Sequence, residues 1–293
     1  MKISELFKTK TPTLSFEVFP PKTSDTYETV KDAAEHIAAL GPDFMSVTYG
    51  AGGGTSKYTI DIAADIEERY GVPVIAHLTC VSSSRDTVKA RIEDMANAGI
   101  KNVLALRGDV PESMKNDDRS LWHYSHAVDL IREIKESGKD FCIGGACYPE
   151  VHPESSCQKE DIKHLKEKID AGCEFLTTQM FFDNNLFYNF MYKIREAGIT
   201  VPIVAGIMPI TNAKQVERAI KLSGSHMPQR FKALVDHFGT DPKAMMQAGI
   251  AYSTDQIIDL LANGISAVHV YSMNKPEVAA AIQKNLSEII PKK

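Results

Sequence analysis

The chain lacks the features that mark several common classes of protein. No stretch approaches the roughly 18 consecutive apolar residues of a membrane-spanning helix, and the first segment, "MKISELFKTKTP", has no long apolar core of a secretory signal. Lys and Arg form no block, and the net charge of −5 gives no reason to expect a nucleic-acid partner. The five cysteines contain no Cys-x-x-Cys pair, which argues against a disulfide framework and a structural zinc site. We therefore expect a cytoplasmic protein with no membrane association.

What is present is the composition of a globular protein. Apolar residues make up 43% of the 293 positions and charged residues 24%, which is enough to fill a sizeable core. A chain of this length forms one large domain or two ordinary ones. No Ser/Pro-rich linker and no shift in composition divides it, so we predict one domain over residues 1–293.

Short β-rich runs alternate with helical segments along the whole sequence. Residues 86–99, for example, place Val88, Ile92 and Met95 on one helical face, and Gly99 ends the segment. The eight candidate strands span residues 14–19, 44–50, 73–80, 102–108, 142–149, 175–182, 201–209 and 267–273. Strands that alternate with helices pair in parallel through crossovers, and eight such units predict a (β/α)₈ TIM barrel.

One segment exceeds the regular strand-helix unit. Residues 225–264, before the eighth strand, are too long for one helix, so we predict an extra helix there. A doubly wound sheet is the rival fold, but it would need a Gly-x-Gly-x-x-Gly turn after its first strand, where this chain has "PPKTSD". The sequence therefore favours the barrel.

Polar side chains occur in or just after almost every candidate strand. They are Glu17, Thr48, His77, Arg107, Asp109, Tyr148, Glu150, His152, Gln179 and Tyr271. Any one of them alone would be interpreted as a core polar group with a hydrogen-bond partner. In a barrel, however, the C-terminal ends of the strands meet at one face, and barrel enzymes carry their chemistry there. The shared placement therefore indicates a functional site.

Glu17 is the most unusual of these residues because it lies within the apolar run "SFEVFPP". An ionised carboxylate without a partner would be costly there. We expect Phe16 and Val18 to desolvate Glu17 and to keep it protonated, so that it can act as a general acid. Pro20 and Pro21 end the strand at once and would fix the carboxyl at the mouth of the barrel.

Three further patterns bear on the kind of ligand. The run "YGAGGGT" from Tyr49 to Thr55 permits either close approach of the backbone to a ligand or a flexible loop. The run "LRGD" presents a guanidinium, a bare backbone and a carboxylate in succession, which suits a heteroaromatic ligand. His77, His152 and Glu17 are candidate ligands of a divalent metal, but no His-x-His or Glu-x-x-His pair supports such a site, and we expect none.

The ordered set of motifs resembles methylenetetrahydrofolate reductase of the bacterial type that consists of a catalytic domain alone. The motifs are "SFEVFPPKT", "VTYGAGG", "HLTC", "ALRGD", "YPEVHPE", "KIDAG", "TTQMFFD", "GIMPITN" and "YSMNKPE". They run in the family's order from about residue 12 to about residue 290. Several motifs are weak individually, but the ordered set is highly specific.

The resemblance implies a flavin-dependent (β/α)₈ barrel that reduces 5,10-methylenetetrahydrofolate to 5-methyltetrahydrofolate. It implies that FAD, or FMN in its place, takes a hydride from NADH or NADPH and passes it to the folate in a ping-pong sequence. We also expect a homo-oligomer. An electron-donating partner protein stays open as the physiological source of reducing equivalents.

The resemblance also assigns roles to residues. Those that would bind the flavin are Thr48, Tyr49, Ala51, His77, Arg107, Gly108, Asp109, Tyr124, Ser125, Tyr148, His152, Asp161 and Lys168, the last four at its ribityl, diphosphate or adenosine end. Those that would bind the folate are Glu17, Asp109, Gln179, Gln215, Tyr271 and Lys275. Glu17 and Asp109 would be catalytic, Glu17 as the acid that protonates N10 and Asp109 as a residue that hydrogen-bonds the pterin. Lys275 stands where an arginine is common in the family, which replaces a bidentate fork by a point charge.

Two other functions stay open on the residues alone. One is a metal-dependent barrel lyase or aldolase that uses His77, His152 and Glu17. The other is a non-catalytic subunit of a larger complex of one-carbon metabolism, against which the complete set of acid and flavin-lining residues argues. A visible absorption spectrum separates the lyase from the flavoprotein, because flavin is yellow.

Overall fold

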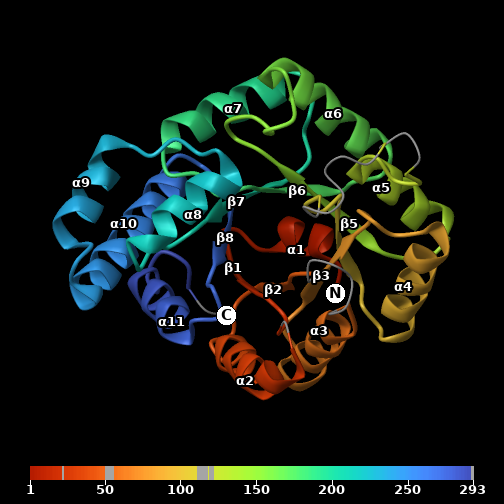
Figure 1. Cartoon of the computed structure of the whole chain (residues 1–293), viewed down its shortest axis with the longest axis horizontal. Helices are drawn as coiled ribbons and strands as arrows, with labels where there is room; N and C mark the ends of the chain where they lie inside the picture. The colour runs from red at the N-terminus through yellow and green to blue at the C-terminus, as the bar shows by residue number, and fades with distance from the viewer. Residues whose placement is uncertain (22, 50–55, 111–117, 119–121, 292–293) are drawn as a thin grey trace.

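The computed structural model describes residues 1–21, 23–49, 56–110, 118 and 122–291 of the chain. Its centre is a closed barrel in which each strand pairs in parallel with the next along the chain and the last pairs with the first (Figure 1). The strands are β1 (Thr13–Val18), β2 (Phe44–Val47), β3 (Val74–Thr79), β4 (Asn102–Leu106), β5 (Cys142–Cys147), β6 (Phe175–Thr178), β7 (Ile203–Ile207) and β8 (Ala267–Tyr271). The predicted (β/α)₈ TIM barrel is confirmed, and only Thr13 lies outside the predicted strand ranges.

A ring of helices covers the outside of the barrel (Figure 1). They are α2 (Tyr27–Ala38), α3 (Ser56–Tyr70), α4 (Arg85–Asn97), α5 (Ala127–Glu136), α6 (Gln158–Asp170), α7 (Asn184–Glu196), α8 (Lys214–Ser223), α10 (Pro242–Ala262) and α11 (Pro276–Asn285). The predicted extra helix before β8 is α9 (Gln229–Phe238), which packs on α10 at the edge of the ring. Among the residues that the structure describes, no helix is both long enough and apolar enough to cross a membrane.

The main hydrophobic core lies between the barrel and the helices. Strand residues such as Phe16, Val18 and Val268 pack there with helix residues such as Ile37 and Ile257. Successive side chains of a strand point to opposite faces, so every second residue of each strand faces the inside of the barrel instead. The side chains inside the barrel are therefore not part of this core, and polar residues can stand there.

The amino-terminal end of the barrel is closed by α1 (Ile3–Thr9), which lies across the barrel in Figure 1. Ile3 and Leu6 of this helix pack with Phe44 and the other first inward residues of the strands in a separate apolar cluster. The buried Asn102 side chain accepts a hydrogen bond from the Ile3 backbone N–H at 2.8 Å. The strand and helix patterns of the sequence do not predict this plug, which leaves the carboxyl-terminal end as the accessible face.

Candidate active site

The inward-facing strand residues change from apolar to polar along the barrel. Phe44 and Ile75, near the starts of β2 and β3, belong to the apolar cluster at α1. The next inward positions, two residues further along, carry Ser46 and His77. Because all strands run in the same direction, the polar residues gather in one layer toward the carboxyl ends of the strands.

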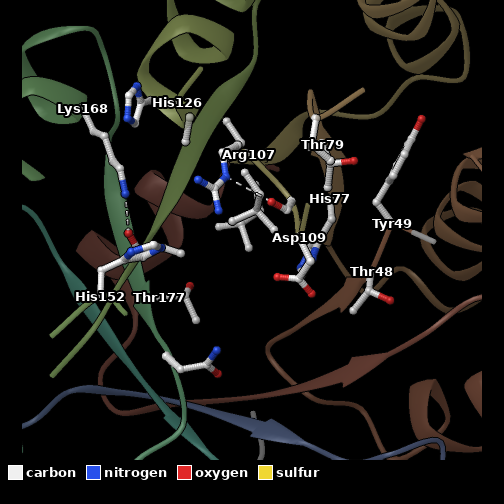
Figure 2. A pocket seen from close by; sticks show the side chains of 18 of the residues that line it. Thr48, Tyr49, His77, Thr79, Arg107, Asp109, His126, His152, Lys168 and Thr177 are labelled. Atoms are coloured by element: carbon white, nitrogen blue, oxygen red, sulfur yellow. Dashed lines mark hydrogen bonds between the residues drawn. The ribbon is translucent and has the colours of Figure 1, made fainter. Parts of the chain in front are cut away.

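A cavity of about 980 Å³ lies over this polar layer (Figure 2). The predicted site residues that line it are Glu17, Thr48, Tyr49, His77, Arg107, Gly108, Asp109, Tyr148, His152, Asp161, Lys168, Gln179 and Tyr271. In Figure 2, Lys168 and His152 lie on one side of the hollow, and Thr48 and Tyr49 lie on the other. The barrel thus brings together most of the residues that the sequence motifs single out.

Glu17 lies in the polar layer and does not pack against Phe16 and Val18. Those two side chains belong to the core between the barrel and the helices. Glu17 Oε2 instead lies 3.6 Å from His77 Nε2 and 3.8 Å from His269 Nε2. The expectation that Phe16 and Val18 desolvate Glu17 is therefore wrong, since neighbours in a strand face opposite sides. The strand carries a carboxylate because that position faces the interior of the barrel.

His77 meets Glu17 as a neutral imidazole. The His77 side chain is buried, and desolvation lowers its pKa to about 4, although the Glu17 carboxyl acts in the opposite direction. His77 is therefore uncharged near pH 7, and its contact with Glu17 is not an ion pair.

The segment after β8 holds the end of β1 in place. Ser272 Oγ donates a hydrogen bond to Glu17 O at 2.6 Å, and the Asn274 side chain accepts from Phe19 N and donates to Phe19 O, both at 2.9 Å. Met273 and Asn274 have φ angles of 55° and 53°, a conformation that is uncommon for residues other than glycine. This double contact fixes the backbone that carries Glu17.

The end of β4 brings a cation, a bare stretch of backbone and a carboxylate to the cavity. Gly108 has a φ angle of +89°, and a Cβ atom there would lie 2.9 Å from Val81 Cγ1, so the position requires glycine. Arg107 forms a bidentate ion pair with Glu154, with Nη1 to Oε2 at 2.5 Å and Nη2 to Oε1 at 3.1 Å. Asp109 is exposed at the cavity wall, where its carboxylate can meet a ligand.

The loop after β5 and the helix α6 form another wall of the cavity. Asp161 Oδ2 accepts a hydrogen bond from His152 N at 3.0 Å, and the Tyr148 ring meets the His152 ring edge-on with 4.6 Å between centroids. Lys168 Nζ donates to Ala146 O at 2.9 Å. Desolvation lowers the pKa of both Lys168 and His152. Asp161 thus orients the loop, and Lys168 places an amine in the wall.

Gln179, directly after β6, and Tyr271 of β8 line the cavity. The Tyr271 hydroxyl donates to Thr178 O at 2.5 Å, and desolvation raises the pKa of Tyr271 well above its ordinary value, so the phenol stays protonated. Gly206 makes room for this ring, because a Cβ atom there would lie 2.6 Å from the Tyr271 hydroxyl. The side-chain oxygen of Gln179 accepts a hydrogen bond from Met180 N at 2.9 Å, which orients the amide.

Two residues predicted to bind the flavin turn away from the cavity. Tyr124 is buried, and its hydroxyl donates to Glu133 Oε2 at 3.3 Å. Ser125 precedes α5, and its backbone N–H donates to Asp129 Oδ2 at 3.1 Å. Neither lines the cavity, and Ala51 lies outside the described residues.

Two residues predicted to bind the folate lie behind the cavity wall. Gln215 Oε1 accepts hydrogen bonds from the backbone N–H groups of Thr211 at 2.9 Å and Asn212 at 3.1 Å, at the start of α8. Lys275 Nζ donates to Thr211 Oγ1 at 2.9 Å. Both residues therefore contact the loop after β7 in this structure, and neither belongs to the cavity lining.

Several lining residues were not singled out by the sequence motifs. They include Ser46, His126, His164, Glu167 and His269. Ser46 lies two residues before Thr48, and His269 lies two residues before Tyr271, so strict strand alternation applied to those positions finds both of them. His126, His164 and Glu167 carry no comparable signal, because the barrel alone brings the start of α5 and the helix α6 together.

Among the residues that the structure describes, no group of three or more His, Cys, Asp and Glu side chains is arranged to hold a metal ion. The candidate metal ligands were His77, His152 and Glu17. Of the other two, the neutral His77 contacts only Glu17, with 3.6 Å between Nε2 and Oε2. The geometry therefore gives no support to the metal-dependent lyase.

Comparison with known proteins identifies the family. A sequence model described as methylenetetrahydrofolate reductase matches residues 2–287. The chain belongs to the methylenetetrahydrofolate reductase family. It is 37% identical over 269 residues to 5,10-methylenetetrahydrofolate reductase of Pectobacterium carotovorum, covering 92% of this chain and 88% of that protein. The Escherichia coli K12 protein of the same name is 34% identical over the same shares of the two chains.

The plant members of the methylenetetrahydrofolate reductase family are longer. Methylenetetrahydrofolate reductase (NADH) 1 of Zea mays is 35% identical over 285 residues, which cover 94% of this chain and 48% of that protein. The chain thus spans about half the length of this relative.

Solved structures with the same fold are more distant in sequence. An uncharacterized protein from Clostridium thermocellum, described as binding two copies of 5-methyl-5,6,7,8-tetrahydrofolic acid, has a TM-score of 0.68 at 16% identity and covers 99% of this chain and 100% of its own. A 2,3-dimethylmalate lyase has a TM-score of 0.53 at 11% identity, covering 98% of this chain and 85% of its own. At such low identity both likenesses show the barrel fold alone.

Proposed function

We propose that this chain reduces 5,10-methylenetetrahydrofolate to 5-methyltetrahydrofolate, with FAD as its bound cofactor and NADH or NADPH as the reductant. The observation that carries the proposal is the position of Glu17. Its carboxyl faces a cavity of about 980 Å³ from the polar layer of the barrel and contacts a neutral His77 at 3.6 Å. Membership in the family supplies the reaction class, and the cavity supplies the acid that the reaction needs.

The cavity walls fit a flavin nucleotide. The volume of about 980 Å³ is near the upper end of the range of small-molecule sites. The bare backbone at Gly108 allows close approach of a flat ring system. Lys168, His152 and Arg107 would supply hydrogen-bond donors to its ribityl and phosphate groups, and FMN is the alternative to FAD. A bound flavin supplies hydride transfer, from the nicotinamide and then to the folate.

The folate needs a proton before it can accept a hydride. When the bond between the methylene carbon and N10 breaks, its electron pair stays on N10, which takes a proton, and N5 becomes an iminium. Glu17 is the group that would supply this proton. Asp109 offers an acceptor, and Gln179 offers both a donor and an acceptor, to the edge of the pterin.

The surroundings of Glu17 suit an acid. A neighbouring positive charge would favour its ionised form. Desolvation lowers the pKa of His77 to about 4 and raises that of Tyr271 well above its ordinary value, so both are neutral near pH 7 and neither adds a positive charge. Neither residue therefore places a positive charge beside the carboxyl of Glu17.

The nicotinamide donor is proposed from the plant relatives. The proteins of Zea mays and Arabidopsis thaliana carry NADH in their names. NADH is therefore the first donor to test, with NADPH in parallel.

Two measurements test the proposed function. The purified protein should show the visible absorption of a flavin, and mass spectrometry of the released cofactor should give the mass of FAD. With NADH or NADPH and methylenetetrahydrofolate, chromatography should detect 5-methyltetrahydrofolate. A colourless protein that does not bind added FAD, or a flavoprotein that forms no 5-methyltetrahydrofolate with either donor, would contradict the proposal.

A further inference from the structure

The peptide unit that joins Thr178 to Gln179 lies just beyond the last residue pair between β6 and β7. That pair is Thr177 with Val204. Thr178 is nevertheless buried, with 1% of its surface exposed, so its polar groups need hydrogen-bond partners inside the protein. The position of these partners shows how the end of β6 is held.

A tyrosine of β8 reaches across β7 to this peptide unit. The Tyr271 hydroxyl donates a hydrogen bond to Thr178 O at 2.5 Å, although β7 lies between β8 and β6 in the barrel. Gly206 of β7 leaves the space for this contact, because a Cβ atom there would lie 2.4 Å from Thr178 O and 2.6 Å from the Tyr271 hydroxyl. The Gly206 N–H donates to Thr178 Oγ1 at 2.9 Å. The contact therefore links three strands at the cavity.

The same peptide unit is held on its other side by β5. The Gln179 N–H donates to Cys147 O at 2.7 Å, and β5 is the neighbour of β6 on the side away from β7. A peptide unit is planar, so one hydrogen bond at its oxygen and another at its N–H together fix its position and its tilt. Tyr271 and Cys147 therefore determine where the Cα atom of Gln179 stands at the cavity.

The side chain of Gln179 is oriented by its own backbone. Its Oε1 accepts a hydrogen bond from Met180 N at 2.9 Å, and the residue lines the cavity. The donors of this side chain are the two N–H groups of Nε2. Because the amide is tied to the backbone, a shift of the preceding peptide unit moves these donors with it.

We propose that Tyr271 is a positioning residue that sets the place of the Gln179 amide at the pterin, and that Gly206 gives it the space to do so. This inference rests on the proposed function, in which Gln179 meets the edge of the pterin. The single hydroxyl proton of Tyr271 is already donated to Thr178 O. Tyr271 therefore acts on the folate through the backbone that carries Gln179.

The carboxyl of Glu17 is the other route by which Tyr271 would influence the reaction. Glu17 is paired with Tyr271 in the register between β1 and β8, and both side chains line the cavity. An effect that passes through the acid would change the limiting rate of the folate half-reaction. An effect that passes through Gln179 would change the affinity for the folate instead. A double-mutant cycle separates the two routes.

The test is a cycle of Tyr271→Phe and Gln179→Ala in the flavin-loaded protein. The rate of flavin reoxidation at increasing methylenetetrahydrofolate concentration gives a half-saturating concentration and a limiting rate. Tyr271→Phe removes only the hydroxyl and should raise the half-saturating concentration by about three- to tenfold, with a smaller change in the limiting rate. Gln179→Ala should raise it by about tenfold or more. The double variant should match Gln179→Ala within about twofold, because Tyr271 acts through that side chain.

Two further variants are matched to this cycle. Tyr252→Phe is the control, because the Tyr252 hydroxyl of α10 donates to another backbone carbonyl, Phe182 O, at 2.7 Å and lies outside the cavity lining. It should leave the half-saturating concentration within about twofold of the wild type. Gly206→Ala places a methyl group in the path of the Tyr271 hydrogen bond and should raise that concentration at least as much as Tyr271→Phe.

Two results of the cycle would overturn the proposal. One is a double variant in which the effects of Tyr271→Phe and Gln179→Ala multiply, because the two residues would then act independently. The other is a Tyr271→Phe protein that keeps the half-saturating concentration of the wild type.

Hydrogen exchange tests the positioning without any folate. The Gln179 N–H belongs to the peptide unit that Tyr271 holds, so Tyr271→Phe should speed its exchange by about three- to tenfold, and Tyr252→Phe should not. Unchanged protection of this N–H in Tyr271→Phe would also overturn the proposal. If the wild-type protein does not reduce methylenetetrahydrofolate at all, the proposed function fails, whereas the exchange measurement still decides whether Tyr271 holds Gln179.

Discussion

The two ends of the barrel are built from the same strands and have opposite chemistry. At the amino-terminal end, Ile3 of α1 packs on an apolar cluster that includes Phe44 and Ile75. Two residues further along the same strands stand Ser46 and His77, which face the cavity. Consecutive inward-facing side chains of the same strand therefore belong first to the hydrophobic plug and then to the polar site.

The two ends also differ in whether their polar side chains are paired within the protein. At the closed end, the Asn102 amide accepts from Ile3 N and donates to Met1 O and Val74 O, so both of its kinds of hydrogen-bonding group have protein partners. At the other end, Asp109 is exposed at the cavity wall. The closed end thus stabilises the fold, and the polar end retains capacity for a ligand.

The largest expected effect comes from removing the acid at the polar end. Glu17→Gln should leave reduction of the flavin by NADH intact and slow the folate half-reaction by about 10²–10⁴-fold, the usual contribution of general acid catalysis. Stopped-flow absorbance of the flavin measures each half-reaction separately. The matched control is Glu174→Gln, because Glu174 accepts from Ser4 of α1 at 2.8 Å and belongs to the closed end. Equal losses in both half-reactions of Glu17→Gln would make Glu17 a structural carboxylate.

A substitution at the closed end should lower the free energy of unfolding and should leave the half-reactions unchanged. Ile3→Ala removes a fully buried side chain beneath the barrel and should lower the free energy of unfolding by about 2–5 kcal/mol. Ile258→Ala, at an exposed position of α10, should change it by less than about 0.5 kcal/mol. Denaturant unfolding measures both variants. A loss of the folate half-reaction per bound flavin in Ile3→Ala would show that the two ends are not separate.

The far wall of the cavity should control retention of the cofactor. Lys168→Ala should weaken FAD binding by about 10–100-fold, because it removes the amine donor from the cavity wall. Lys166→Ala, on the same helix but paired with Asp170 at the surface, is the control and should have little effect. Flavin fluorescence during dilution gives the dissociation constants. A Lys168→Ala protein that purifies fully loaded would refute the assignment.

The smallest expected effect is at Lys275, which lies behind the cavity wall. Lys275→Ala frees Thr211 from its contact and should raise the KM for methylenetetrahydrofolate by about two- to tenfold, whereas Lys275→Arg should preserve or lower it. Steady-state kinetics at varied folate concentration measures both. An equal effect on the NADH half-reaction would mean that Lys275 does not act on the folate.

The sequence predicts the barrel well because each strand and each helix carries its own local pattern. It does not predict α1, since seven residues are too short for a periodic signal and the barrel above decides their packing. The environment of Glu17 was predicted wrongly because adjacent residues in a sequence face opposite sides of a strand. The direction of Tyr124 toward Glu133 depends on a tertiary contact that no motif records.

The most direct test of the account is an anaerobic stopped-flow experiment on the wild-type protein. The flavin should bleach when NADH or NADPH is added and recover its colour when methylenetetrahydrofolate follows, with one equivalent of 5-methyltetrahydrofolate formed per flavin. Such a result is expected if the polar end of the barrel is the site of folate reduction. A flavin that bleaches and stays reduced after the folate is added would contradict that claim.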